Sequence, residues 1–188
     1  MYNKIFTILL CLPLIVKSQQ SNDSIKYIQN LNEVNVNALR VGAKTPVSFT
    51  NINKDEINKG NLGQDLPYII SMTPSVVTTS DAGAGIGYTG FRIRGSDPTR
   101  INVTINGIPL NDSESQGVWW VNMPDFSSSI DNIQIQRGVG TSTNGASSFG
   151  ASVNLQTNDI KTKPYAITSN TIGSFNTLKN NIEFGTGL

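Results

Sequence analysis

The chain has 188 residues, enough for one domain with a hydrophobic core, and it contains no histidine. The lack of histidine excludes histidine-based acid–base catalysis and histidine metal sites. Charged residues make up only 14% of the sequence and the formal net charge is +1, so no nucleic-acid partner is indicated.

Residues 1–18 are typical of a secretory signal peptide. Lys4 supplies the positive charge, residues 5–16 the apolar stretch, and Ser18 the small residue at its end. The apolar stretch is shorter than the roughly 20 residues of a membrane-spanning helix. Cys11, the only cysteine, follows a leucine rather than a small residue, which does not favour a lipoprotein signal. The exported chain would then carry no thiol.

Residues 19–40 are predicted to form a flexible polar segment. Within it, Leu31–Leu39 reads LNEVNVNAL, so that valine alternates with asparagine. Two interpretations of this pattern are open. It is either an ordinary first strand of the domain, or a mobile strand on a tether that adds to the open sheet edge of a partner.

A domain of short helices and strands is predicted over residues 41–158. One strand is expected at Val47–Ile52 and another at Ser75–Thr79. Between them, apolar residues at helical spacing predict two short helices within Lys54–Met72, separated by Gly60.

The stretch Phe91–Leu110 is predicted to form a hairpin at the centre of the sheet. In its first run, apolar residues alternate with Arg92 and Arg94 at period 2. The second run, Ile101–Ile105, is closed by Asn106-Gly107, a strong turn signal because both residues accept positive φ. One face of the sheet is therefore expected to carry arginines.

A glycine-rich segment precedes this stretch and contains G-x-G-x-x-G at Gly85, Gly87 and Gly90. A dinucleotide fingerprint would need a helix N-terminus directly after the glycines. The residues that follow, FRIRGSDP, alternate with period 2 and reach a proline within eight residues. A flexible loop is therefore predicted in place of a nucleotide site.

The loop Asn111–Pro124 combines acidic and amide residues with adjacent Trp119 and Trp120. Such tryptophans are either buried core residues or packing surfaces for a ligand, and both interpretations are open. Asp112 and Glu114 are the carboxylate pair available for catalysis, but no orienting partner is visible beside them. The sequence therefore does not predict an enzyme.

The pattern of apolar and polar residues changes in the last segments of the chain. Phe126–Gln136 predicts a helical turn and a strand, Gly140–Ala151 a second small-residue loop, and Val153–Thr157 the final strand of the domain. After a polar connector, Pro164–Leu188 contains two alternating runs like transmembrane strands, which need about 9–11 residues each. Two strands cannot close a barrel, so most of any barrel would lie outside this chain.

These motifs resemble a TonB-dependent outer-membrane receptor, specifically its N-terminal plug domain and first barrel hairpin. FRIRG at Phe91–Gly95, INVTINGIPL at Ile101–Leu110, the strand, Arg-Gly and loop series at Ile130–Thr157, and DLPYIISMTPSV at Asp65–Val76 carry the resemblance. LNEVNVNAL looks like the TonB box. The texture is most similar to receptors of the Bacteroidetes kind. The implied fold is an α+β plug domain with a small mixed β-sheet, short helices and long loops. The first strands of an incomplete transmembrane antiparallel β-barrel would follow at residues 159–188.

The resemblance implies active uptake of a scarce substrate such as a ferric chelate (siderophore) across the outer membrane of a Gram-negative bacterium. No cofactor, metal site or catalytic residue is implied. The implied partners are TonB with ExbB-ExbD in the periplasm, outer-membrane lipid around the barrel, and the small-molecule cargo. The TonB-box residues would be Leu31, Asn32, Glu33, Val34, Asn35, Val36 and Asn37.

The resemblance also implies roles for the arginines and the loops. Plug arginines, here Arg92, Arg94 and Arg137, would pair with barrel carboxylates. Ligand would bind the apical loops, expected at residues 80–88, 111–120 and 140–148. The candidate contact residues are Tyr88, Asp112, Ser113, Glu114, Gln116, Trp119 and Trp120. A complete receptor of this family is several times longer, so the alternative is a stand-alone periplasmic plug-like binding module. The sequence does not identify the cargo.

Overall fold

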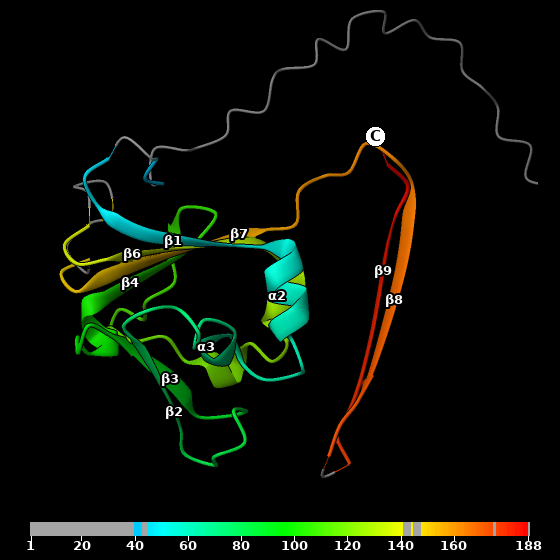
Figure 1. The fold of residues 1–188 in the computed structure, drawn as a ribbon, viewed down its shortest axis with the longest axis horizontal. Helices are drawn as coiled ribbons and strands as arrows, with labels where there is room; N and C mark the ends of the chain where they lie inside the picture. The colour runs from blue at the N-terminus through cyan, green and yellow to red at the C-terminus, as the bar shows by residue number, and fades with distance from the viewer. Residues whose placement is uncertain (1–39, 43–44, 141–143, 145–147, 175, 188) are drawn as a thin grey trace, which may run out of the picture. The chain divides into compact units, whose positions relative to one another are not determined.

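A computed structural model describes residues 40–42, 45–140, 144, 148–174 and 176–187 (Figure 1). All of them belong to one compact unit, Asn35–Leu188. The signal peptide predicted at residues 1–18 and the TonB box predicted at residues 31–37 lie outside the described residues.

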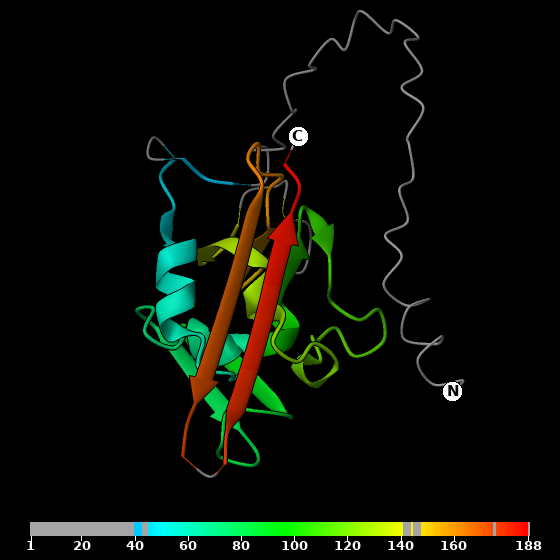
Figure 2. The same cartoon turned by 90° about the vertical axis from the view of Figure 1, so that its right-hand side faces the viewer.

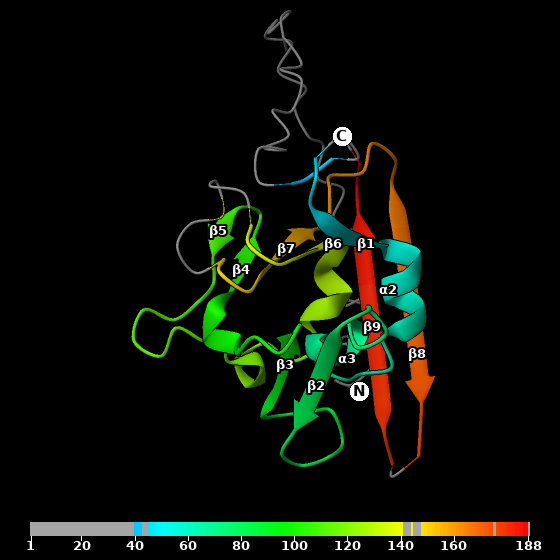
Figure 3. The ribbon, with the colours of Figure 1, turned by 60° about the vertical axis from the view of Figure 1, so that its left-hand side comes forward.

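A five-stranded mixed sheet forms the centre of the domain (Figures 1 and 3). Its strands are β1 (Ser48–Asn53), β4 (Ile101–Ile105), β5 (Ile108–Pro109), β6 (Ile130–Arg137) and β7 (Ala151–Thr157), in the spatial order β1-β6-β7-β4-β5. β4 and β7 run parallel, whereas the other neighbours are antiparallel. The predicted small mixed sheet is therefore confirmed.

The predicted hairpin over Phe91–Leu110 is wrong in its pairing. Strand β3 (Thr89–Ile93) pairs with β2 (Val76–Ser80) in a separate two-stranded sheet, whereas β4 lies in the central sheet. The cause lies in the connection, because Arg94 and Gly95 both take positive φ, 51° and 76°, and turn the chain away. The Asn106-Gly107 turn itself is confirmed, with φ of 49° and 85°, and it joins β4 to β5.

Two short helices form as predicted. Helix α2 (Lys54–Gly60) begins at a capping box, in which the Asn53 side chain accepts from the Glu56 N–H and the Glu56 carboxylate accepts from the Asn53 N–H. Helix α3 (Leu66–Ile69) has a proline in its first turn, where a missing N–H costs nothing. Three 3-10 turns follow later in the described part of the chain: η2 (Pro98–Arg100), η3 (Trp120–Asn122) and η4 (Phe126–Ser129).

One face of the central sheet packs into the hydrophobic core. Alternate strand residues point to this face, so Ile133 and Ile135 of β6 lie opposite Leu155 and Val153 of β7. Side chains from both helices, β3 and η3 cover them, and all are buried: Ile57, Leu66, Ile69, Ile70, Phe91, Ile93 and Trp120.

The opposite face of the sheet is polar and also buried. Gln134 and Gln136 of β6 point to this face and are 2% and 0% exposed. The other buried polar residues of this face are Asn102, Thr104, Ser152 and Asn154. Val41 and Asn144 lie over it, through hydrogen bonds described below.

The last two strands, β8 (Tyr165–Ile172) and β9 (Leu178–Gly185), form an antiparallel hairpin (Figure 2). In β9, exposed Leu178, Ile182 and Phe184 alternate with partly buried polar residues, which confirms the predicted alternation. Among the described residues, no helix is long and apolar enough to cross a membrane.

Candidate functional site

A pocket of about 360 Å³ lies where two of the predicted loops meet. The connection between β2 and β3 contributes Asp81, Gly87 and Tyr88, and the loop before η3 contributes Ser115, Gly117, Val118 and Trp119. The Tyr88 and Trp119 rings meet edge to face, with centroids 6.5 Å apart. The pocket thus has an aromatic wall built from two loops that are distant in sequence.

The two adjacent tryptophans have different environments. Trp120 is 4% exposed and packs on Phe91, with ring centroids 5.9 Å apart. Trp119 is 51% exposed and reaches the pocket surface. Both tryptophans line the pocket, but Trp120 is a core residue, whereas for Trp119 a ligand contact stays a prediction.

The charge of the pocket is slight. Asp81 is its only Asp or Glu, and its lining includes neither lysine nor arginine among the described residues. The other polar side chains of the lining are hydroxyl residues and the two tryptophans: Thr79, Tyr88, Thr89, Thr99, Ser115, Trp119 and Trp120. Such a surface can pack on an apolar or planar group and donate a few hydrogen bonds.

A buried carboxylate fixes one wall of this pocket. Asp65, 3% exposed at the start of α3, accepts hydrogen bonds from the Gly87 N–H (3.0 Å) and the Thr89 hydroxyl (2.8 Å). Its own N–H donates to the Gly85 carbonyl at 2.9 Å. Gly85 and Gly87 of the G-x-G-x-x-G segment thus belong to a turn held by Asp65, whereas Gly90 lies within strand β3 and no helix begins there. Sequence reasoning missed Asp65, whose only signal was its place before a helical proline.

The acidic residues predicted as ligand contacts lie on an exposed turn beside the pocket. The Asp112 carboxylate accepts from the Ser115 N–H at 2.7 Å, and the Gln116 N–H donates to the Asp112 carbonyl at 2.9 Å. The backbone hydrogen bond from Ser115 is the main cause that lowers the pKa of Asp112 below its ordinary value. Asp112, Ser113, Glu114 and Gln116 are absent from the residues that line the pocket.

The third predicted loop, residues 140–148, lies elsewhere among its described residues. The Asn144 carbonyl accepts from the Asn102 amide at 2.8 Å and the Asn144 amide donates to Gln136 at 3.0 Å, on the polar face of the sheet. None of the described residues of this loop lines the pocket. The structure therefore brings together two of the three predicted loops.

The three predicted arginines fall into two places. Arg92 forms an ion pair with Asp97 at 2.6 Å, in which both side chains are about half exposed. Arg94 donates to the Arg137 carbonyl at 3.1 Å, and Arg137 donates to the carbonyls of Pro74 and Phe49 at 3.3 and 3.4 Å. Within the described ranges, neither Arg94 nor Arg137 has an acidic partner, and the Arg137 Nε is buried without a hydrogen bond.

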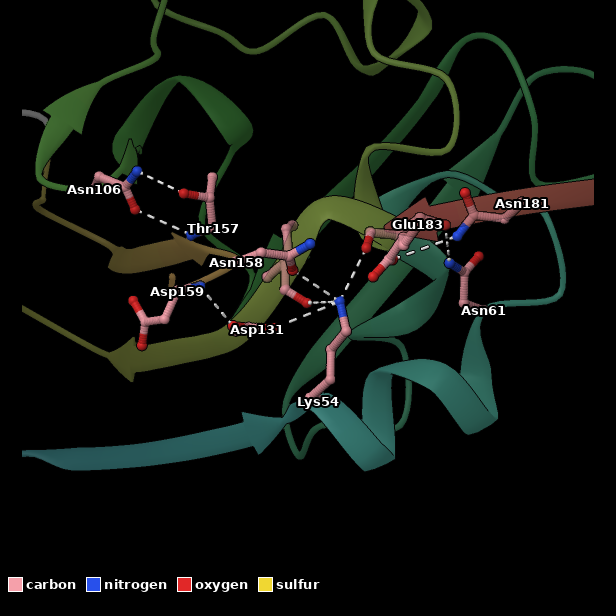
Figure 4. A network of polar contacts seen from close by, with 11 residues as sticks. Lys54, Asn61, Asn106, Asp131, Thr157, Asn158, Asp159, Asn181 and Glu183 are labelled. Atoms are coloured by element: carbon pink, nitrogen blue, oxygen red, sulfur yellow. Dashed lines mark hydrogen bonds and ion pairs between the residues drawn. The ribbon is translucent and has the colours of Figure 1, made fainter. Parts of the chain in front are cut away.

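A polar network lies between α2, β6 and the segment that leads to the hairpin (Figure 4). The Lys54 ammonium donates to the carbonyls of Ser128 and Ile130 at 2.9 and 3.0 Å and to the Asn158 side chain at 2.9 Å. It also lies 3.5 Å from Asp131, whose other carboxylate oxygen accepts from the Asp159 N–H. On the described residues, no cluster of side chains suited to a metal ion occurs.

Residues 42–152, more than half of the chain, match the model of the TonB-dependent Receptor Plug Domain family. The chain belongs to this family. The mixed sheet, short helices and long loops are accordingly the fold of a plug domain. A comparison with curated proteins found no match.

Solved receptor structures share this fold at low sequence identity. The pyoverdine outer membrane receptor FpvA from Pseudomonas aeruginosa PAO1 is 16% identical with a TM-score of 0.60, over 77% of this chain and 20% of that one. The ferric yersiniabactin uptake receptor FyuA from Yersinia pestis is 12% identical with a TM-score of 0.56, over 76% of this chain and 22% of that one. The ferric-catecholate import receptor Fiu from E. coli K12 is 18% identical with a TM-score of 0.58, over 77% of this chain and 19% of that one. The chain thus spans about a fifth of the length of these receptors.

Proposed function

We propose that this chain is the plug of an outer-membrane receptor that takes up a scarce substrate, such as a ferric chelate, with energy delivered by TonB. The family match over residues 42–152 carries this proposal. The solved structures with the same fold support the cargo class, because they are receptors for pyoverdine, ferric yersiniabactin and ferric catecholates. In this assignment the chain binds and gates, and it catalyses no reaction.

The proposed arrangement divides the chain into four segments. Residues 1–18 direct export, residues 19–40 form the periplasmic tether, residues 41–158 form the plug, and residues 159–188 begin the barrel. TonB, working with ExbB-ExbD, pairs as a strand with residues 31–37 of the tether. The polar alternation of this segment supports the proposal, since such a strand joins a partner mainly through backbone hydrogen bonds.

The adjacent arginines support a barrel partner for the plug. The Arg94 guanidinium donates to the Arg137 backbone carbonyl, and neither arginine has an acidic partner among the described residues. A charged group that is buried without a partner is unfavourable, and the Arg137 Nε is buried without a hydrogen bond. We assign the missing partner to a carboxylate of the barrel wall. Arg92 already has Asp97, so its pairing with the barrel would need an exchange of partners.

The pocket is the proposed place of cargo contact on the plug. Tyr88 and Trp119 offer an exposed aromatic surface, and Trp120 forms the floor behind them. The exposed turn with Asp112, Ser113, Glu114 and Gln116 lies next to this surface in the chain and would touch a cargo larger than the pocket. Replacing Trp119 by alanine removes aromatic contact area without touching the core.

Uptake of radioactive iron tests this function. The complete gene product is expressed in a Gram-negative strain that lacks its own ferric-chelate receptors, with and without TonB. We expect saturable uptake of at least one ferric chelate that disappears without TonB or after a protonophore. Uptake that continues equally without TonB would refute the proposal.

A further inference from the structure

The turn η4 and the start of β6 form the meeting point of three segments of the chain. Asp125 precedes η4 with a φ of +52°, a left-handed conformation that aspartate tolerates better than most residues. Its Oδ1 atom accepts from the Ser128 hydroxyl at 2.8 Å and from the Asn61 amide, at the end of α2, at 3.3 Å. The carboxylate is thus fixed by the plug itself.

The β8–β9 hairpin contacts this carboxylate through a lysine. Lys179 of β9 places its ammonium 2.6 Å from Asp125 Oδ1 and 3.2 Å from the Ser128 hydroxyl. The Lys179 and Asp125 side chains are 12% and 38% exposed, against 51% and 48% for the Arg92–Asp97 pair. The Lys179–Asp125 pair is therefore less screened by water than that pair, and its hydrogen bond is charge-assisted.

A second lysine approaches the same turn from the plug. Lys54, at the start of α2, binds the Ser128 carbonyl, while Lys179 binds the hydroxyl of the same residue. Lys54 also binds Asn158, which belongs to the segment leading into the hairpin (Figure 4). Residues 125–131, which we call the hub, therefore connect α2, the exit segment and β9 through two ammonium groups.

We propose that the hub seats the plug against the first barrel hairpin, with Lys179 as the positioning residue. The contact reverses the charges expected for plug and barrel, since here the plug supplies the carboxylate and the hairpin supplies the cation. It also lies apart from Arg94 and Arg137, so the plug would be held at two separate places. This inference goes beyond the proposed uptake function, because it concerns how the plug is held in place.

The hub gives the connecting segment between plug and hairpin a defined path. The Asp159 N–H donates to Asp131 at 2.8 Å, and Asn106 at the β4–β5 turn exchanges two hydrogen bonds with Thr157. Loss of Lys179 would leave these contacts in place but would free β9 from η4. The expected defect is therefore a weaker contact between the plug and the β8–β9 hairpin, with the plug still folded.

Hydrogen exchange in the complete receptor tests this positioning role. The variants are Lys179→Met, Asp125→Asn, their double mutant, and Lys179→Arg. Asp125→Asn keeps an oxygen acceptor and a residue that tolerates positive φ, while it removes the charge. Lys163→Met is the matched control, because Lys163 is an exposed lysine just before the hairpin.

We expect Lys179→Met to raise exchange about fivefold to tenfold in both residues 125–131 and β9, as for the loss of one charge-assisted hydrogen bond. Lys179→Arg should restore much of the protection, and the double mutant should be no worse than either single variant, because each removes the same pair. Lys163→Met should change nothing.

A functional readout separates seating from hairpin stability. A loosened plug should admit a large antibiotic that intact outer membranes exclude, so cells with Lys179→Met should become more sensitive to it. Faster exchange confined to β9, additive effects in the double mutant, or unchanged antibiotic entry would each overturn the proposal. Failure of iron uptake in the wild-type receptor alone would instead count against the proposed function.

Discussion

The side chain of Gln134 takes the place of a neighbouring strand for Val41. Its Oε1 accepts from the Val41 N–H at 2.9 Å, and its Nε2 donates to the Val41 carbonyl at 3.1 Å. Arg40 beside it donates to the Asn132 side chain at 2.7 Å. The chain that emerges from the proposed tether is therefore fastened to the polar face of the sheet before β1 begins.

Removing the two hydrogen bonds between Gln134 and Val41 should destabilise the plug. Gln134→Leu keeps the size of the side chain but leaves the backbone groups of Val41 without partners, in a place where Val41 is buried. Each buried group that loses its partner costs about 1–3 kcal/mol. We expect a fall in the free energy of unfolding within or somewhat above this range, measured by denaturant titration. Leu62→Gln, at an exposed site, is the control, and an equal effect there would contradict a stabilising role of the Gln134–Val41 hydrogen bonds.

The two tryptophans should respond differently to truncation. Trp120→Ala removes a buried ring that packs on Phe91 and should cost about 3–5 kcal/mol of folding free energy. Trp119→Ala should cost less than about 1 kcal/mol, because the side chain is half exposed. Thermal unfolding of both variants measures the difference. Equal losses would show that Trp119 is as much a core residue as Trp120.

Gly150 should not tolerate a side chain, for reasons of space rather than conformation. A Cβ atom there would collide with the Ser96 side chain and lie 3.1 Å from the Arg100 carbonyl. We expect Gly150→Ala to destabilise the plug by about 1–3 kcal/mol, as overpacked sites do. The second change Ser96→Gly should recover part of the loss. Gly42→Ala, whose Cβ would meet nothing within 4 Å, is the control.

The turn at Asp112 should be sensitive to strong acid only. The pKa of Asp112 is lowered, first by the Ser115 N–H, so the carboxylate is more acidic in the folded chain than in the unfolded one. Its contribution is therefore present above the ordinary aspartate pKa and is lost as pH falls through the lowered folded value. NMR of the Ser115 amide against pH should show its shift change below about pH 3.8, the ordinary value. A midpoint above that value would contradict the hydrogen bond.

Local features of this fold were predictable because they depend on neighbouring residues. The positive φ of Asn106 and Gly107, the two short helices and the alternation in β9 all arise within a few positions of the chain. Strand pairing was not, since β3 pairs with β2 instead of β4 through contacts that no local pattern encodes.

Other features that the sequence did not predict also depend on contacts formed only in the folded chain. Gln134 and Gln136 alternate with isoleucine, yet both are buried: Val41, 93 positions away, binds Gln134, and Asn144 of the following loop binds Gln136. Asp65 looked like an ordinary residue before a helix, and its partners Gly87 and Thr89 are identified only by the fold. The Lys179–Asp125 contact joins residues separated by most of one hairpin and two strands.

Capture of TonB by the tether tests the central claim most directly. The complete receptor is purified and its affinity for the periplasmic domain of TonB is measured, with Val36→Pro in the predicted TonB box and Ser24→Pro as the control in the same tether. Proline removes a backbone donor that an added strand needs. We predict binding that falls at least tenfold, about 1.4 kcal/mol, in Val36→Pro and is unchanged in Ser24→Pro. No binding by the wild type, or equal binding by all three, would contradict a TonB-driven plug.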